Sequence, residues 1–445
     1  MSSLSVIGRP FGKTAGITQL FDVRLILPHS SLMGLLDCLL AARLNVFIDE
    51  ILPRKPNHHS FVGARPHTQV LDIAHICQTA VEKGIDSKSN CAIAQGDVEK
   101  YFDSLQLFKI LRWLHRFSFP GHVLCGVFRL QVFTTLYVML ADSCTKKQVR
   151  CRHIGGLTGS RTAVALARIP IEQMLVTLDE ALKTNAFLGR VSIGCYVDNL
   201  FAIGNSITGA VNMLQDCEAY LQEHWNLRLK PSSLEVMPVA GYGDVEEFSE
   251  RWTLVSGFKV LGHRIQSSGA IDVCWDYTLK AAWRQFWGNI GRPAFRKFDV
   301  SLKRKRLESL VLSVIRFRLS RWPFCASKAK ALDVVQRKMV GHIQNFKFPP
   351  ALSVEANLRR KQRLVSETIQ VRWSRIWASS VVKWSEHVSR NTLGCCWSAQ
   401  IADICTPEQL ALRRAQNHAR PDTRSIAGFV ALRWYESINC ARTFD

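Results

Sequence analysis

The feature that most constrains this chain is a short acidic turn between two apolar runs, within residues 190–203. One apolar run ends at Tyr196, the next begins at Leu200, and Asp198 lies between them. Two runs of strand length joined by such a turn are typical of a β-hairpin, here with a carboxylate at its tip. An acidic hairpin tip is costly to bury and well suited to hold a metal ion, so Asp198 is the first candidate functional residue.

A second acidic segment lies well upstream. Asp97 follows the apolar run Cys91–Ala94 and is the first residue of the acidic segment Asp97–Asp103. Two carboxylates at separate strand ends are the minimum that holds a pair of Mg²⁺ ions for phosphoryl transfer. Asp97 and Asp198 together therefore predict a two-metal site, and in this they resemble the palm of a nucleic-acid polymerase.

Charge is distributed unevenly along the 445 residues, which carry a formal net charge of +22. From Asp276 to the end there are 31 basic and 12 acidic residues, a net of +19, and the residues before it carry the remaining +3. This asymmetry predicts a catalytic body followed by a region that binds a polyanion, with nucleic acid favoured over a merely solvated basic face. A hydrophobic content of 47% is that of a folded protein and excludes a disordered chain.

The 14 cysteines follow no regular spacing, and we interpret them as reduced thiols of an intracellular protein. One cluster suggests zinc: Cys395, Cys396, Cys405 and His418. Its spacing matches no finger or knuckle, so buried or incidental thiols are the favoured interpretation.

Apolar periodicity predicts helices at 32–48, 68–83, 104–117, 162–183 and 207–223, and a helical chain from 277 onward. The stretch 122–140 is interrupted by Arg129 and Gln131, so it predicts a core helix rather than a membrane span. Another hairpin is predicted from Phe258–Ile265 and Ala270–Cys274. Asp103 is expected to cap the helix that follows it.

A glycine-rich turn, Gly155–Ser160, leads into the helix predicted at 162–183. Glycine allows the backbone to approach a base pair or a phosphate, which makes Gly159 a candidate nucleotide-binding residue.

Taken in order, these segments resemble the reverse transcriptases of non-LTR (LINE-like) retrotransposons. The resemblance is carried by Arg24–Ile26 with Leu39–Leu44, Gly63–Pro66 with Asp72, Gly96–Leu105, Gly155–Leu166, Tyr196–Asn199, and Leu229–Glu235 followed by Leu261–Gly262. Two later segments, Trp373–Arg375 and Trp384–Arg390, are similar to the tail beyond the family's thumb. No single motif is decisive, but their order and spacing are.

The resemblance implies an α+β fold, the right-hand polymerase. Mixed fingers are expected at 1–95, an antiparallel palm sheet with helices at 96–275, a helical thumb at 276–350, and a basic helical C-terminal tail at 351–445. The missing upstream endonuclease and downstream knuckle suggest the polymerase core of a larger polyprotein.

For the chemistry, the resemblance implies that Asp97 and Asp198 are catalytic and that both, with Asn199, bind two Mg²⁺ ions, with Mn²⁺ as a substitute. Phe102 matches the aromatic residue beneath the sugar, whose bulk favours deoxynucleotides, and a core aromatic is the alternative. Arg65 and Arg24 are expected to contact the triphosphate, with ordinary solvated arginines as the alternative.

The resemblance also implies the partners: an RNA template, a DNA primer, their duplex and dNTPs, with no membrane. Tyr196 and the basic run Lys303, Arg304, Lys305 and Arg306 are expected to contact nucleic acid. Action in the nucleus follows from the resemblance to target-primed elements.

Four departures from the family pattern are visible. Asn199 stands where the family has the second acid of the hairpin, and Thr158 stands where it has a glutamine. Ala163–Val164 replace a Ser-Pro pair, and Ser233 replaces a lysine. An amide oxygen still coordinates Mg²⁺ but neutralises no charge, so metal affinity is expected to fall. Together the departures suggest a copy that has drifted or a lineage with unusual motifs.

Two hypotheses therefore stand: an RNA-directed DNA polymerase, and a non-catalytic nucleic-acid-binding protein that keeps the fold. A third, an RNA-templated RNA polymerase, is disfavoured by the bulk of Phe102.

Overall fold

The computed structural model describes residues 5–12, 23–26, 31–52, 60–63, 65, 68–133, 135–139, 146–149, 154–187, 193–239, 250–270, 272–290, 292–322, 324–391 and 439–444. The chain divides into two compact units. The first contains residues 1–73, 91–238 and 243–255, and the second contains 74–90, 239–242 and 256–445. The suspected zinc cluster lies outside the described residues.

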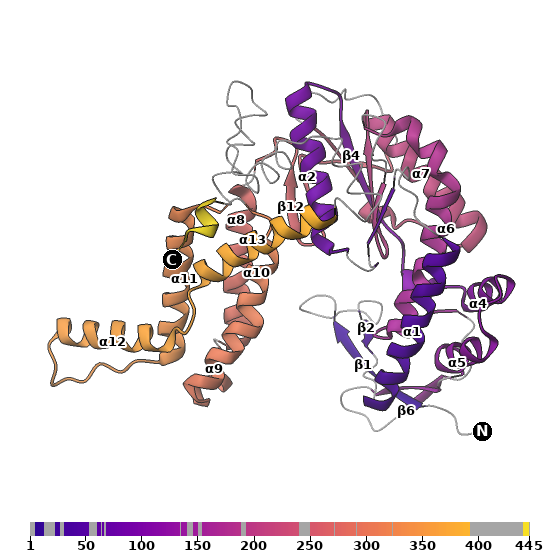
Figure 1. The fold of residues 1–445 in the computed structure, drawn as a ribbon. Coiled ribbons are helices and arrows are strands. Elements are labelled where there is room, and N and C mark those ends of the chain that lie inside the picture. The colour runs from indigo at the N-terminus through magenta and orange to yellow at the C-terminus, as the bar shows by residue number, and fades with distance from the viewer. Residues whose placement is uncertain are drawn as a thin grey trace. The chain divides into compact units, whose positions relative to one another are not determined.

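A six-stranded sheet forms the centre of the first unit (Figure 1). Its strands, in spatial order, are β10 (Thr253–Leu254), β9 (Glu235–Pro238), β4 (Ala92–Asp97), β8 (Asn199–Gly204), β7 (Ile193–Tyr196) and β3 (Ser60–Val62). The four central strands are antiparallel, as expected for the palm, and the two edge strands pair parallel. The hairpin expected around Asp198 is confirmed as β7 and β8, and the strand expected to approach Asp97 is confirmed as β4.

Helices of the first unit are α1 (Ser31–Ile51), α3 (Tyr101–Ser104), α4 (Leu107–Arg116), α5 (Gly121–Gln131), α6 (Arg161–Asn185) and α7 (Ile207–Trp225). Helix α7 packs on β4, β8 and β9, and α6 packs on α7 and on α1. The sheet strands bury nearly continuous apolar runs, such as Ala92–Ala94 of β4, because helices cover them. The sheet and helices confirm the expected α+β class.

A four-stranded sheet in the same unit has the order β2 (Val23–Ile26), β1 (Ser5–Gly12), β5 (Thr135–Met139) and β6 (Lys146–Val149). The single core helix expected over 122–140 is therefore wrong in its second half. Helix α5 ends at Gln131, and the β-branched and aromatic residues that follow form a strand beside β1.

A buried carboxylate fixes the start of α6. Asp37, on α1, accepts hydrogen bonds from the backbone N–H groups of Arg161 and Thr162 at 2.6 and 3.0 Å, and from Ser160 Oγ at 2.7 Å. Burial alone would raise the pKa of Asp37, but these hydrogen bonds outweigh it and hold the pKa below its ordinary value. The N-terminal N–H groups that a helix leaves unpaired are thus satisfied from a second helix.

Among the described residues, α1 is the helix that is long and apolar enough to cross a membrane. In this structure it packs against α5 and α6. Three polar side chains on its length, Asp37, Asn45 and Asp49, are bonded to α6 or to the residues that open it.

The second unit begins with most of α2 (Val70–Ser87) and a two-stranded hairpin, β11 (Gly257–Val260) and β12 (His263–Gln266). The hairpin predicted from 258–265 and 270–274 is wrong in the position of its turn and of its second strand. The turn is Leu261–Gly262, whose φ angles of +46° and +100° are those of a tight two-residue connection. Residues 272–274, predicted as the second strand, open helix α8 instead.

The described residues of the second unit from 272 to 391 are largely helical, as predicted. Their elements are α8 (Asp272–Gln285), η3 (Phe286–Ile290), η4 (Pro293–Lys297), α9 (Val300–Arg306), η5 (Leu307–Leu312), α10 (Ser313–Leu319), α11 (Ala326–Gln344), α12 (Val354–Thr368) and α13 (Trp373–Asn391). Trp373, Trp377 and Trp384 of α13 are all buried, which agrees with one packed face rather than a surface for stacking bases. The indole N–H of Trp377 donates to the carbonyl of Leu319 at 2.8 Å.

Candidate active site

The two aspartates singled out by the sequence lie on neighbouring strands. Asp97, the last residue of β4, stands opposite Asn199, the first residue of β8. The backbone N–H of Val98 donates to the carbonyl of Asp198 at 2.9 Å, which ties the hairpin tip to the end of β4. Asp97 and Asp198 are both half-buried. The sheet thus brings together two carboxylates that are far apart in sequence.

The hairpin tip is a two-residue turn, Val197–Asp198, and Val197 has a φ of +59°. A β-branched residue in the left-handed region is unusual, and such strain is held only where the surroundings impose it. Here β7 and β8 pair directly on both sides of the turn, with Tyr196 opposite Asn199.

The side-chain amide of Asn199 forms a hydrogen bond within the site. Its Nδ2 donates to Asp198 Oδ1 at 3.0 Å, so the side chain that replaces the family's second acid binds the carboxylate next to it. The amide oxygen of Asn199 is a ligand atom of the kind that Mg²⁺ accepts. Asp97, Asp198 and Asn199 therefore offer hard oxygen donors that suit Mg²⁺, with one negative charge fewer than a triad of acids. In the described parts of the chain, this site included, no three His, Cys, Asp or Glu side chains gather to hold a metal.

Ser233 has a role that the sequence did not reveal. Its hydroxyl accepts a hydrogen bond from the backbone N–H of Asp97 at 2.9 Å and donates to the carbonyl of Lys230 at 2.7 Å. The N–H of Lys230 donates in turn to the carbonyl of Asp97 at 2.8 Å. The residue that replaces the family's lysine thus clamps the backbone of a predicted catalytic aspartate, and only the tertiary pairing reveals it.

The glycine-rich turn lies against the segment that follows Asp97. The N–H groups of Gly155 and Gly156 donate to the carbonyls of Leu105 and Phe102 at 2.9 and 2.7 Å. Gly155 has a φ of +91°, and a Cβ there would lie 3.1 Å from the carbonyl oxygen of Asp103, so glycine is required. The turn therefore fixes the backbone of Phe102.

Phe102 itself is half-buried and packs against the core, with its ring 5.9 Å from that of Tyr101. Its role at the sugar stays a prediction, as does nucleotide binding by Gly159. The cap predicted for Asp103 is wrong: Asp103 lies inside the short helix α3, and α4 begins after Gln106 with no side-chain cap.

Arg65 is held inside the first unit by a network of charges. Its guanidinium binds Glu172, whose side chain is 0% exposed, and donates to the carbonyl of Leu52 at 3.0 Å. Arg168 donates to the same carboxylate at 2.7 Å and also pairs with Asp49. This engagement gives Arg65 a structural role, and its contact with a triphosphate stays a prediction. Arg24 pairs with Phe11 in the β1–β2 ladder, and its side chain lies outside the described residues.

The basic run of α9 does not lie uniformly at the surface. Lys303 is buried, and its ammonium donates to the carbonyl of Ile343 at 3.4 Å. Lys305 and Arg306 are exposed and Arg304 is half-buried. Lys303 therefore supports the fold of the second unit, and nucleic-acid binding by the run stays a prediction that rests on the other three residues.

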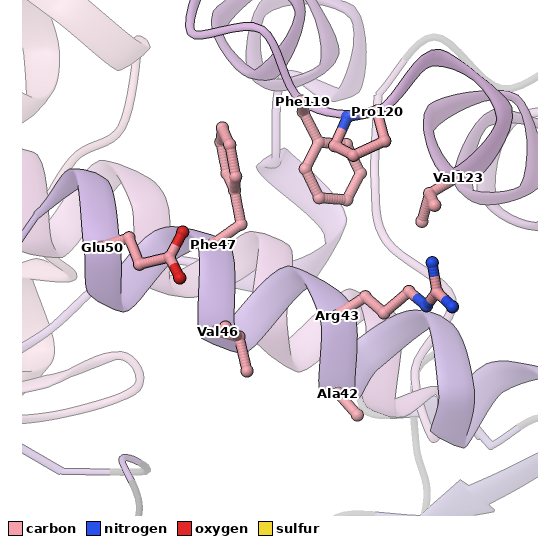
Figure 2. A pocket seen from close by; sticks show the side chains of 8 residues that line it. All are labelled: Ala42, Arg43, Val46, Phe47, Glu50, Phe119, Pro120 and Val123. Atoms are coloured by element: carbon pink, nitrogen blue, oxygen red, sulfur yellow. The ribbon is translucent and has the colours of Figure 1, made fainter.

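A separate pocket of about 380 Å³ lies between α1 and the start of α5 (Figure 2). Its lining is largely apolar, with Arg43 and Glu50 as its charged members, and includes Val46, Phe47 and Phe119. None of the predicted site residues lines it, so this pocket is distinct from the paired aspartates.

A family model described as "Reverse transcriptase (RNA-dependent DNA polymerase)" matches residues 22–265, which include every residue of the candidate active site from Arg24 to Ser233. No curated protein sequence matches the chain.

Among solved structures, the chain is similar to yeast telomerases. Apo telomerase from Candida tropicalis truncated from its C-terminal domain is 10% identical, with a TM-score of 0.40, and the match covers 59% of this chain and 53% of that one. Telomerase from Candida albicans in complex with a fragment of telomeric RNA is 10% identical, with a TM-score of 0.42, covering 90% and 66%. Apo telomerase from Candida tropicalis is 10% identical, with a TM-score of 0.44, covering 88% and 67%. The chain thus spans about half to two thirds of the length of these proteins.

Proposed function

The chain belongs to the reverse transcriptase family, and we propose that it is the RNA-directed DNA polymerase of a non-LTR retrotransposon. It would extend a DNA primer on an RNA template with dNTPs. The observation that carries the proposal is the pairing of β4 with β8. It places Asp97, the last residue of β4, beside the hairpin tip that carries Asp198. The match to the family supports the polymerase, and the sequence motifs alone support the retrotransposon origin.

Asp97 and Asp198 would hold Mg²⁺ by their carboxylates, with the amide oxygen of Asn199 as a further donor. When bound, the metal would polarise the triphosphate and lower the pKa of the primer's 3′-hydroxyl. The protein's own contribution is positional. Ser233 holds the backbone of Asp97, and the N–H of Val98 holds that of Asp198. In this way the backbone that carries each carboxylate is held in place before any substrate binds.

A second candidate function, a non-catalytic nucleic-acid-binding protein, is favoured by one observation. The amide of Asn199 donates to Asp198 Oδ1, which occupies a lone pair that a metal would otherwise use. The site is therefore weaker toward cations than one with a third carboxylate. The excess of basic residues beyond Asp276 supports nucleic-acid binding under either hypothesis. We place the protein's action in the nucleus, in keeping with the motifs' resemblance to target-primed elements.

Primer extension on poly(rA)/oligo(dT) with dTTP and Mg²⁺ or Mn²⁺ tests the proposal. Extension by the native chain that is lost in an Asp97→Asn/Asp198→Asn double variant would establish the polymerase. Extension by an Asn199→Asp variant alone would locate a defect in the metal site. Absence of extension from every variant, with salt-sensitive duplex binding retained, would favour the binding protein.

A further inference from the structure

Residue 63 lies directly beside the catalytic hairpin. Strand β3 pairs parallel with β7, with Val62 opposite Cys195. The ladder continues by one bond, because the N–H of Gly63 donates to the carbonyl of Cys195 at 2.7 Å. Gly63 therefore stands next to Tyr196, two residues before Asp198.

No side chain fits at residue 63. A Cβ built on Gly63 would overlap Cδ2 of the Tyr196 ring, and would lie 3.1 Å from Cε2 and 3.2 Å from the carbonyl oxygen of Cys195. The ring of Tyr196 thus lies against the bare Cα of Gly63. It is half-buried there, and burial raises the pKa of the Tyr196 hydroxyl.

The segment that carries Gly63 is anchored on its other side by Arg65. The side chain of Arg65 is 13% exposed, and it binds the fully buried Glu172 of α6 through Nε at 3.2 Å and through Nη2. The same guanidinium donates to the carbonyl of Leu52, just after α1. A planar guanidinium held by a carboxylate and a carbonyl fixes both position and orientation. Gly63 is thus bonded to the hairpin through its own N–H, and two residues later the chain is bonded to α6 and to the end of α1 through Arg65.

We propose that Gly63 is a positioning residue of the polymerase site: its missing side chain sets where the ring of Tyr196 lies, and with it the hairpin tip and the end of the nucleic acid. The inference rests on the proposed function. An added methyl group displaces the ring of Tyr196, because Arg65 prevents the β3 segment from moving away. Displacements of about 1 Å at such sites cost about a hundredfold in rate.

A kinetic double-variant cycle tests this. Gly63→Ala is expected to lower kcat/KM for primer extension about 10- to 100-fold in the native background. The same loss is expected in the Tyr196→Phe background, because Phe keeps the ring. In the Tyr196→Ala background the same change is expected to have less than about a twofold effect, because the overlap is gone. Equal losses in all three backgrounds, or no loss in any, would overturn the proposal.

Gly34→Ala is the matched control. Gly34 lies on α1, and a Cβ there meets nothing within 4 Å, so activity is expected to stay unchanged. Melting temperatures of all variants are measured in parallel. If Gly63→Ala fails to fold, the Gly63→Ala/Tyr196→Ala double variant must recover folded protein, and failure to recover it would also refute the contact.

The outcome is separable from that of the proposed function. If the native chain extends no primer, the polymerase proposal fails, and the same cycle is then read in the dissociation constant for a primer–template duplex and in the melting temperature. If the effects of the two substitutions on both quantities are not additive, residues 63 and 196 are coupled and the positioning role is supported. Additive effects would refute it.

Discussion

The unit that holds the paired aspartates contains a buried group of charges, whereas the ion pairs described on α12 of the second unit lie at the surface. In the first, Arg65 and Arg168 share the carboxylate of Glu172, which is 0% exposed. In the second, Arg363 pairs with Glu367 on α12 with side chains 81% and 55% exposed. Buried pairs fix geometry, and exposed pairs contribute little to stability.

Aromatic packing takes the structural role of the buried charges in the second unit. Trp373 and Trp377 are each 1% exposed, and the Trp377 ring lies 4.7 Å from Phe324 and 5.7 Å from Trp275. Most of the described basic residues of that unit are exposed or half-buried. Removing a buried charge such as Glu172 is therefore expected to damage the fold of the first unit, and removing exposed basic residues of the second unit is expected to weaken binding to a polyanion.

The largest expected effect concerns the charges that serve chemistry. Asp97→Asn removes a carboxylate that would hold Mg²⁺, so primer extension should fall by about a thousandfold or more, since metal charge stabilisation is worth several kcal/mol. The melting temperature should change little, because the side chain is half-buried and the backbone clamp by Ser233 remains. Asp216→Asn, an exposed carboxylate change on α7, is the control and should keep full activity.

Next in size is the effect of breaking the buried network. Glu172→Leu leaves Arg65 and Arg168 without their shared carboxylate in a buried site, which should lower the free energy of unfolding by about 3–5 kcal/mol. Urea denaturation of the variant measures it. Glu367→Gln, which breaks the exposed pair with Arg363, should leave the denaturation curve unmoved. Similar losses in the free energy of unfolding for the two variants would contradict the difference between the buried and the exposed ion pairs.

A pH dependence of the second unit sharpens the comparison. Burial of His263, with Arg321 and Arg318 nearby, lowers its pKa from 6.5 to about 3. Between these two values the unfolded chain binds a proton that the folded chain does not. Stability from this group is therefore complete above pH 6.5 and is lost as pH falls, by about 1.4 kcal/mol per pH unit. Denaturation of the native chain and of His263→Leu from pH 7 to pH 4 checks this, and parallel pH profiles would contradict it.

How much of this was predictable depends on whether the signal is local. The hairpin that carries Asp198 and the helix α6 are predictable because two apolar runs around an acidic turn, and apolar periodicity after a glycine-rich turn, all lie within short windows. The β11–β12 turn was missed because Leu261–Gly262 lacks the Asn-Gly or Asp-Gly signature of tight hairpins.

Long-range polar partners left no trace in the sequence. Ser233 was judged only as a missing lysine, although it binds the backbone of Asp97. Arg65 was predicted to meet a triphosphate, and its partner Glu172 lies more than a hundred residues away on another element. Such pairings arise from tertiary contacts that have no periodicity, so a single sequence does not disclose them.

The smallest expected effect separates residues within one basic run. Neutralising Arg304, Lys305 and Arg306 should weaken duplex binding and reduce the slope of log affinity against log salt by about 0.9 for each phosphate that the protein no longer neutralises. Lys303→Ala should instead lower the melting temperature and leave the slope unchanged, because that ammonium is buried and bound to the carbonyl of Ile343. Titrating a fluorescent RNA–DNA duplex at several salt concentrations gives both slopes. If Lys303→Ala flattens the slope as neutralising Arg304, Lys305 and Arg306 does, the Lys303 ammonium binds the polyanion too. The charges of α9 then do not divide into structural and nucleic-acid-binding ones.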